Sequence, residues 1–99
     1  MGITGVHDAW QDRVTIEAIV ELIEENKLPL RCYGMLAGND PDLLNEHFKK
    51  GHYYNEYLTI RSAKAFIDGA LGSRGAALHE PYCDDSNNCG LILINKKEF

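Results

Sequence analysis

One lysine stands at the start of an apolar run that leads into a loop rich in glycine and polar side chains. Residues 64–75 read KAFIDGALGSRG. Burying an unpaired ammonium is costly, so Lys64 must reach water, find a partner or take part in chemistry. It can be a solvated strand-end lysine, or a Schiff-base or general-base lysine. Carbamylation by CO2 offers a third use, because it makes an anionic oxygen ligand that can bridge two metal ions.

The loop after this lysine supplies three more candidate functional side chains, Asp68, Ser73 and Arg74. Arg74 can clamp a carboxylate with two hydrogen bonds, or form a structural ion pair with Asp68 or Glu80. The glycines of the loop are spaced GxxGxxG, but the pattern lacks the Lys-Ser/Thr ending of a phosphate-binding loop. Glycines that let the backbone turn are therefore favoured over a phosphate cradle.

Two other groups of residues have ligand chemistry. His7 and Asp8 are expected at the carboxyl end of a first strand, where βα barrels place catalytic side chains. Without a partner in view, a hydrogen-bonding role at the strand end is favoured over ligation. His79, Cys83 and Cys89 are residue types that bind zinc, so a zinc site built from them is a second possibility. No paired CxxC or HxxxH motif frames these three residues, and structural zinc needs four ligands.

The first half of the chain predicts a strand, a helix and a second strand. Residues 3–7 are apolar and β-branched, and Asp12 is a good N-cap for the helix that follows. Apolar side chains recur at helical spacing in this helix, while glutamates occupy the other face. The Leu28-Pro29 pair ends it, and residues 30–36 predict a second buried strand.

The second half predicts one more helix and one more core strand. Asp40 followed by Pro41 is a helix start, and the pattern places one apolar face on Leu43, Leu44, His47 and Phe48. Residues 58–60 are expected to form a short strand leading into a buried strand at 63–67. Asn95 and Glu98 have the spacing of a capping box, which predicts the start of a further helix.

This order of elements indicates an α/β fold with about three core parallel strands and intervening helices. A complete (β/α)8 barrel needs about 250 residues, so a chain of 99 residues can supply less than half of one.

Composition narrows the possible partners and location. The chain has 10 Lys and Arg against 15 Asp and Glu, a net charge of -5, and no basic stripe, which disfavours nucleic-acid binding. No apolar run is long enough to span a bilayer and no signal peptide is visible, so we expect a soluble cytoplasmic protein without membrane contacts. The chain has three cysteines, a number that is both small and odd, which disfavours a disulfide framework.

Three segments together resemble a known enzyme family. They are GITGVHDAW, LPLRCYGML and, most specifically, KAFIDGALGSRGAALHEPYCDD followed by GLIL. In order and over essentially the whole chain, they are similar to the metal-dependent amidohydrolases of the amidohydrolase-3 group, the YtcJ-like branch. The resemblance implies that residues 1–99 are a fragment of a single TIM-barrel catalytic domain. It also implies a hydrolase that uses a metal-activated water on amide or other C–N bonds of a small molecule.

The resemblance also assigns roles to individual residues. Lys64 matches the strand-end lysine that is carbamylated in this superfamily and bridges two divalent metals, for which zinc is expected. Asp68, Ser73, Arg74 and His7 then become substrate-proximal candidates. The histidine pair, the later histidines and the late aspartate of the family pattern are not found in this sequence, so the isolated chain is expected to bind no metal and to be inactive. The alternative is a non-catalytic α/β module that binds a partner or self-associates through exposed strand edges.

Overall fold

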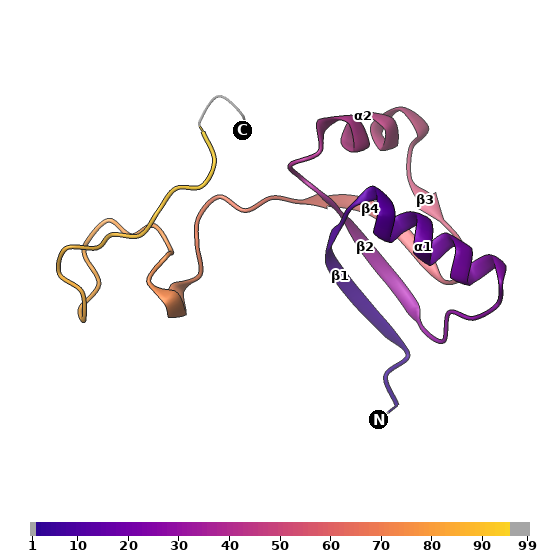
Figure 1. Cartoon of the computed structure of the whole chain (residues 1–99), viewed down its shortest axis with the longest axis horizontal. Coiled ribbons are helices and arrows are strands. Elements are labelled where there is room, and N and C mark those ends of the chain that lie inside the picture. Colours follow the sequence, from indigo (N-terminus) through magenta and orange to yellow (C-terminus); the bar gives the residue numbers. More distant parts are fainter. Residues whose placement is uncertain (1, 96–99) are drawn as a thin grey trace. The chain divides into compact units, whose positions relative to one another are not determined.

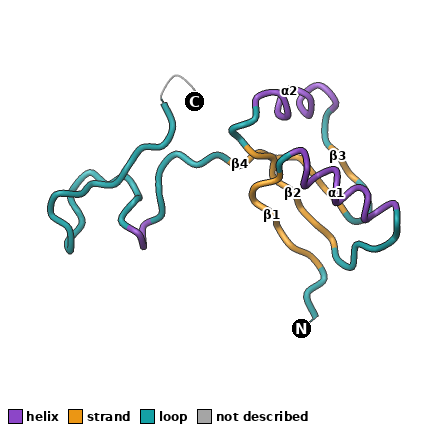
Figure 2. Tube along the Cα trace, in the orientation of Figure 1, coloured by secondary structure: helices purple, strands orange, loops and turns teal. Residues whose placement is uncertain are grey.

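The computed structural model describes residues 2–95 and divides the chain into two compact units, one ending at Ala65 and one beginning at Phe66. The first unit alternates strands and helices, and the second is almost entirely loop (Figures 1 and 2). The elements are β1 (Gly5–Gln11), α1 (Arg13–Glu24), β2 (Arg31–Ala37), α2 (Pro41–Lys50), β3 (Tyr53–Tyr54), β4 (Leu58–Lys64) and the 3-10 turn η1 (Leu71–Ser73).

The four strands form one sheet in the order β1-β2-β4-β3. β2 pairs in parallel with both β1 and β4, and α1 and α2 form the crossovers between them. The short β3 pairs antiparallel with the first half of β4. The predicted parallel α/β arrangement of three core strands is confirmed, and β3 is an addition that the sequence did not predict.

Both helices pack against the same face of this sheet. The core is a single apolar cluster built from Cys32, Leu36, Leu43, Leu58 and Ile60. Leu43 comes from α2, and the apolar stripe of α1 that the sequence predicted (Ile16, Ile19, Val20 and Ile23) lies against the cluster. We call the other side of the sheet, against which neither α1 nor α2 packs, the helix-free face.

Local capping explains why both helices begin where they do. The Asp12 carboxylate accepts a hydrogen bond from the backbone N–H of Thr15 at 2.8 Å, and that of Asp40 accepts one from Leu43 at 2.9 Å. Each bond satisfies a donor that a helix N-terminus would otherwise leave without a partner. α2 ends at Gly51, whose φ of 81° favours glycine. Both predicted helix starts are therefore confirmed.

Three details of the sequence prediction are wrong. β1 begins at Gly5 and runs past His7 to Gln11. The expected strand at residues 58–60 is present, but it continues without a break as one strand, Leu58–Lys64, which ends before the predicted end at residue 67. The polar residues Arg61 and Ser62 hide this continuity from a search for apolar runs. Phe48 is 76% exposed, since the core contacts of α2 are made by Leu43 and Leu44.

The second unit is a set of turns held by a few long-range hydrogen bonds. The backbone N–H groups of Gly69 and Leu91 both donate to the carbonyl of Gly75, at 3.0 and 3.1 Å. Gly69 and Gly75 pack so closely that an added Cβ on Gly69 would lie 2.8 Å from the backbone of Gly75. These glycines act as turn and packing residues, as the sequence favoured. The predicted capping box reaches Glu98, which lies outside the described residues.

Among the described residues, no helix is both long and apolar enough to cross a membrane.

Candidate functional site

Lys64 is the last residue of β4, at the carboxyl end of the parallel sheet. It is the Cα partner of Ala37, the last residue of β2. Its carbonyl accepts a hydrogen bond from the N–H of Gly38 at 2.8 Å, and the residue is half-buried. The carboxyl ends of parallel strands are where βα barrels place their active sites, so this location suits a functional lysine.

The register places Lys64 on the helix-free face. Paired residues of parallel strands share a face, and faces alternate along each strand. Leu36 lies in the core beneath the helices, so its neighbour Ala37 and the partner of Ala37, Lys64, belong to the other face. Tyr33 is on the same helix-free face, and its ring stacks on that of His7 with 4.9 Å between centroids.

His7 lies lower in the sheet than the sequence predicted. It is the partner of Tyr33, four residues before Ala37, which corresponds to about 13 Å along the strand. A bulge after Asp8 carries β1 on to Gln11, so His7 is a mid-strand residue rather than a strand end. His7 and Lys64 therefore share a face without being brought together.

Asp68 and Ser73 are tied into the loops of the second unit. The Asp68 carboxylate accepts a hydrogen bond from the N–H of Ala77 at 3.0 Å. The Ser73 hydroxyl donates to the carbonyl of Ala70 at 3.2 Å. Both side chains thus brace the backbone of the turn region in which they lie.

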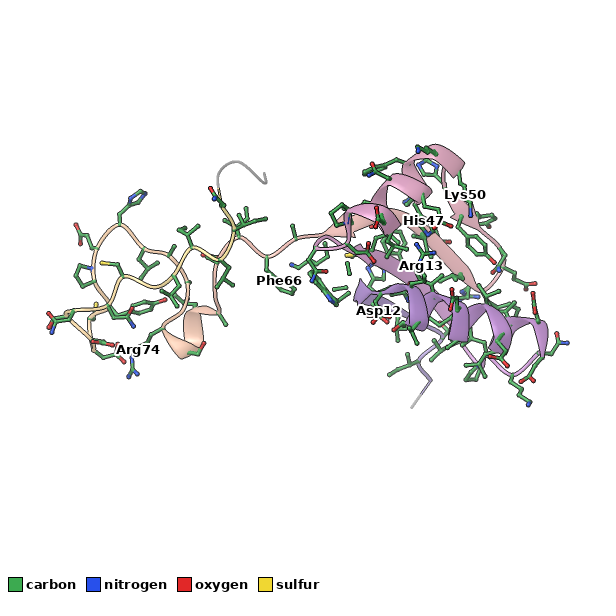
Figure 3. The ribbon with its side chains drawn as sticks, turned by 45° about the horizontal axis from the view of Figure 1, so that its top comes forward. Asp12, Arg13, His47, Lys50, Phe66 and Arg74 are labelled. Carbon is green, nitrogen blue, oxygen red and sulfur yellow. The ribbon has the colours of Figure 1, made fainter. Side chains whose placement is uncertain are left out.

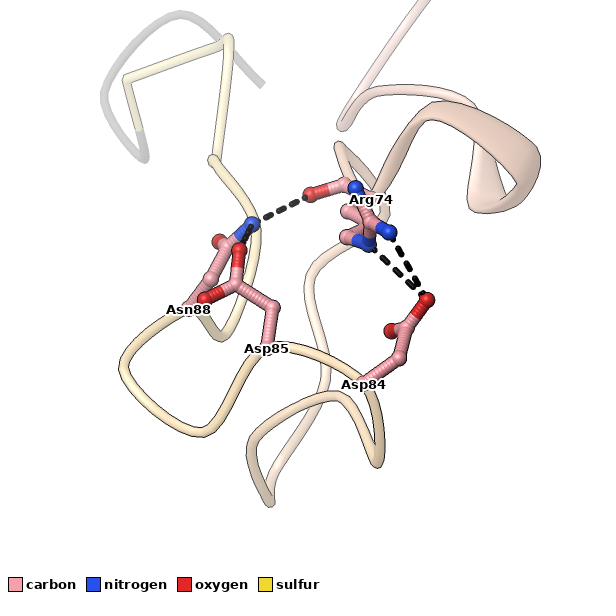
Figure 4. A network of polar contacts seen from close by, with 4 residues as sticks. All are labelled: Arg74, Asp84, Asp85 and Asn88. Atoms are coloured by element: carbon pink, nitrogen blue, oxygen red, sulfur yellow. Dashed lines mark hydrogen bonds and ion pairs between the residues drawn. The ribbon is translucent and has the colours of Figure 1, made fainter.

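Arg74 is the centre of a polar network (Figure 4). Its Nε and Nη2 donate to one carboxylate oxygen of Asp84 at 3.1 and 2.8 Å, and its carbonyl accepts from Asn88 at 3.2 Å. The bonds from Arg74 lower the pKa of Asp84, and that carboxylate raises the pKa of Arg74. The sequence left open a carboxylate clamp or a structural ion pair with Asp68 or Glu80. The partner is Asp84 instead, because the turns at residues 82–88 bring it back to Arg74.

The described residues do not assemble a metal centre. Within residues 2–95, no group of three or more His, Cys, Asp or Glu side chains is placed to hold a metal ion, and this includes His79, Cys83 and Cys89. The three cysteines, Cys32 among them, are free thiols. Asp68, Ser73 and Arg74 all belong to the second unit.

Sequence reasoning missed a charged cavity of about 350 Å³ between α1, α2 and β3. Arg13, His47 and Lys50 are among the residues that line it, and Figure 3 shows these three side chains on α1 and α2. Glu46 bridges the two helices, with its carboxylate 2.8 Å from Arg13 and 2.6 Å from Lys50. Hydrogen bonds from Lys50 and Arg13 lower the pKa of Glu46 to about 2, whereas burial lowers the pKa of His47.

This cavity is a helix-packing feature rather than part of the lysine site. Its apolar lining, Ile16 and Leu43, belongs to the core side of the sheet, opposite the helix-free face that carries Lys64. The i,i+4 spacing of Glu46 and Lys50 was the one signal in the sequence that could have indicated the network. Arg13 could not have been assigned to it without the fold.

Comparison with known proteins gives matches along the whole chain. A family model described as "Amidohydrolase family" matches residues 1–99. The putative amidohydrolase YtcJ of Bacillus subtilis is 33% identical over 95 residues, which cover 91% of this chain and 17% of that protein. The protein LONG AFTER FAR-RED 3 of Arabidopsis thaliana is 41% identical over 57 residues, or 58% of this chain and 10% of that protein.

Two solved structures share the fold. Both are described as uncharacterized metal-dependent hydrolases, one from Pyrococcus furiosus and one from Pyrococcus horikoshii, with sequence identities of 30% and 26%. Each superposes with a TM-score of 0.74 over 95% of this chain and 19% of its own. The chain thus spans about a fifth or less of the length of these relatives.

Proposed function

Because this chain belongs to the amidohydrolase family, we propose that it is part of a metal-dependent hydrolase that cleaves amide or other C–N bonds of small molecules. The observation that carries the proposal is the position of Lys64. It ends a core strand of a parallel sheet and lies on the helix-free face. In a (β/α)8 barrel, that is the mouth of the active site.

The proposed parent fold is a (β/α)8 barrel to which this chain contributes part of the wall. Three parallel strands with helices on one face are what such a segment requires. The helix-free face would then line the barrel interior. The likeness to solved metal-dependent hydrolases over 95% of this chain supports this proposal.

Lys64 fits the role of one metal ligand. A half-buried lysine at a strand end can react with CO2 through its unprotonated amine. A bond forms between Nζ and the CO2 carbon, Nζ releases a proton to solvent, and the resulting carbamate offers anionic oxygen ligands. If a divalent metal, for which we propose zinc, were bound there, it would supply Lewis acidity and would lower the pKa of a coordinated water. The chain's own contribution is to hold the Lys64 side chain at the strand end.

The remaining candidate residues support this site without completing it. We propose that Asp68, Ser73 and Arg74 brace or line the mouth, since each already fixes a turn of the second unit. His7 is proposed to lie beneath the mouth, stacked on Tyr33. With no group of three His, Cys, Asp or Glu ligands in residues 2–95, we propose that the isolated chain is inactive. A cytoplasmic location remains an expectation from the sequence.

The test compares Lys64→Ala with Lys49→Ala in a longer protein that contains this chain and hydrolyses a C–N bond. Lys49 is an exposed lysine on α2, so its loss should leave activity and metal content unchanged. Lys64→Ala should lose both, and a short carboxylic acid added to the buffer should restore part of the activity by replacing the carbamate. Full activity of Lys64→Ala would overturn the proposal. Turnover with stoichiometric metal in the isolated chain would overturn its inactivity.

A further inference from the structure

The side chains in the second half of β4, residues 61–64, do not continue the alternation between faces that residues 58–60 set. Leu58 and Ile60 are both buried in the core beneath the helices. In a regular strand, Ser62 and Lys64 would point to the same face as these two residues, because side chains alternate with a period of two. Lys64 would then be directed under the helices and away from the helix-free face.

A bulge at Arg61 exchanges the two faces for the residues that follow it. Ile60 pairs with Gly34, but Ser62 pairs with the next residue, Met35, so that Arg61 is the extra residue. A shift of one residue moves every later side chain to the opposite face. Ala63 takes the position beside core residue Leu36, and Lys64 turns onto the helix-free face.

A stack of three side chains holds the bulge from the helix-free face. The guanidinium carbon of Arg61 lies 5.6 Å from the centroid of the Tyr33 ring, within the range of a cation–π interaction. Tyr33 in turn stacks on His7 of β1. The stack therefore spans the three parallel strands and contacts β4 at the residue where its register shifts.

The neighbouring strand changes register at the same level. In β1, Asp8 pairs with Gly34 and Gln11 pairs with Leu36, so that Ala9 and Trp10 together oppose one residue of β2. Bulges are enriched next to active sites, where they redirect side chains or end the pairing of strands. Both bulges thus lie beside the same stretch of β2. They separate the regularly paired first halves of the strands from the carboxyl end of the sheet, where side chains are turned to the opposite face.

We propose that Arg61 is a positioning residue whose bulge, fixed by the stack on Tyr33 and His7, turns Lys64 toward the metal site. The inference rests on the proposed function of Lys64 as a ligand. In the competing register without a bulge, Ser62 would pair with Leu36 in the core and Ala63 would pair with Ala37. The two registers therefore place different residues beside Ala37.

Cysteine cross-linking in the 99-residue chain distinguishes these registers. The native thiols are first removed by Cys32→Ala, Cys83→Ser and Cys89→Ser. Ala37→Cys is then combined with Lys64→Cys, which reports the bulged register, or with Ala63→Cys, which reports the regular one. Paired Cα atoms about 4.8 Å apart lie within the range that a disulfide can bridge. We expect the pair 37 and 64 to form a disulfide at least about tenfold faster than the pair 37 and 63.

The role of Arg61 is tested by the rate at which the cysteines at positions 37 and 63 form a disulfide. Arg61→Ala should raise that rate about two- to fivefold, the population shift that loss of one exposed cation–π contact allows. Arg61→Lys keeps a cation over the ring and should largely suppress the increase. The matched control is Arg31→Ala, which removes the same charge from an exposed position outside the stack and should change nothing.

Two results would overturn the inference. One is faster cross-linking of the pair 37 and 63 than of the pair 37 and 64 with Arg61 in place, a comparison that stands even if Arg61→Ala fails to fold. The other is an equal effect of Arg61→Ala and Arg31→Ala. Neither measurement involves metal or hydrolysis. A bare Lys64 in an active parent would refute the proposed function and leave the register result intact.

Discussion

Ala37 of β2 and Lys64 of β4 are Cα partners at the carboxyl ends of two parallel strands. This pairing puts the only strand-end lysine of the described sheet on the helix-free face, which is the face that a barrel would enclose. The two helices pack on the other face and stabilise the strands.

Gly34 allows the buried end of β1 to close over β2. A Cβ at this position would lie 2.6 Å from the side-chain carbon Cδ of Gln11 and even closer to its Oε1, and Gln11 is fully buried. We predict that Gly34→Ala lowers the free energy of unfolding by about 1–3 kcal/mol through overpacking, measured by urea denaturation. Gly72→Ala, which meets no atom within 4 Å, is the control. Equal stability of the two variants would contradict the packing described here.

Glu46 should make the first unit sensitive to acid. Its pKa is lowered from 4.5 to about 2 by Lys50 and Arg13, so the unfolded chain binds more protons than the folded chain between these values. The stabilisation is therefore present above about pH 4.5 and is lost as the pH falls toward 2. The melting temperature of Glu46→Gln should fall less steeply over this window than that of the wild type.

The control for Glu46 is Glu21→Gln on α1, which removes the same charge. Among the described residues, Glu21 forms no ion pair, so its variant should keep the wild-type slope of melting temperature against pH. A slope for Glu46→Gln as steep as that of Glu21→Gln would show that the bridge between α1 and α2 does not contribute.

Arg74 should protect the loops of the second unit from proteolysis. Its backbone adopts the left-handed conformation with φ of 58°, which suits glycine better than other residues, and its side chain binds Asp84. We predict modestly faster cleavage for Arg74→Ala, which loses the ion pair and keeps the strain. Arg74→Gly should fall between this variant and the wild type. The control Glu80→Gln should be cleaved at the wild-type rate, and if Arg74→Ala matches it, the network does not hold the loops.

The isolated chain should self-associate. β1 and β3 are the edge strands of the sheet, and the second unit exposes several large apolar side chains, namely Phe66, Ile67, Leu71, Leu91, Ile92 and Leu93. Exposed edges and apolar surface favour association. Sedimentation should show a sedimentation coefficient that rises with concentration and falls in Leu91→Glu. Val14→Glu, at an exposed position on α1, should behave as the wild type, and a monomer at every concentration would contradict the prediction.

The helices could be predicted from the sequence because their signals are local. Asp12 and the Asp40-Pro41 pair cap helices through bonds to residues three positions away, and the apolar spacing of α1 identifies the face that meets the core. The parallel order of the three core strands followed from the alternation of elements. The helix signals depend only on neighbours within one or two turns.

The strand ends could not be predicted because they depend on pairing between strands. The upper half of β4 reads Arg61-Ser62-Ala63-Lys64, which has no apolar alternation, and a bulge changes its phase. Gln11 is fully buried only because a second bulge turns it over Gly34. The residue type of Lys64 and the family resemblance of the chain make this lysine a candidate. The face of the sheet on which it lies could be determined only from the register of the strands.

The chemical state of Lys64 tests the central claim most directly. A longer, metal-loaded protein that contains this chain should be digested under mild alkaline conditions, or labelled with 13CO2 and followed by NMR. We predict that the peptide carrying Lys64 gains the mass of one CO2, or that a carbamate carbon resonance appears and is lost in Lys64→Arg. A catalytically active, metal-loaded protein in which Lys64 is a bare ammonium would contradict the account.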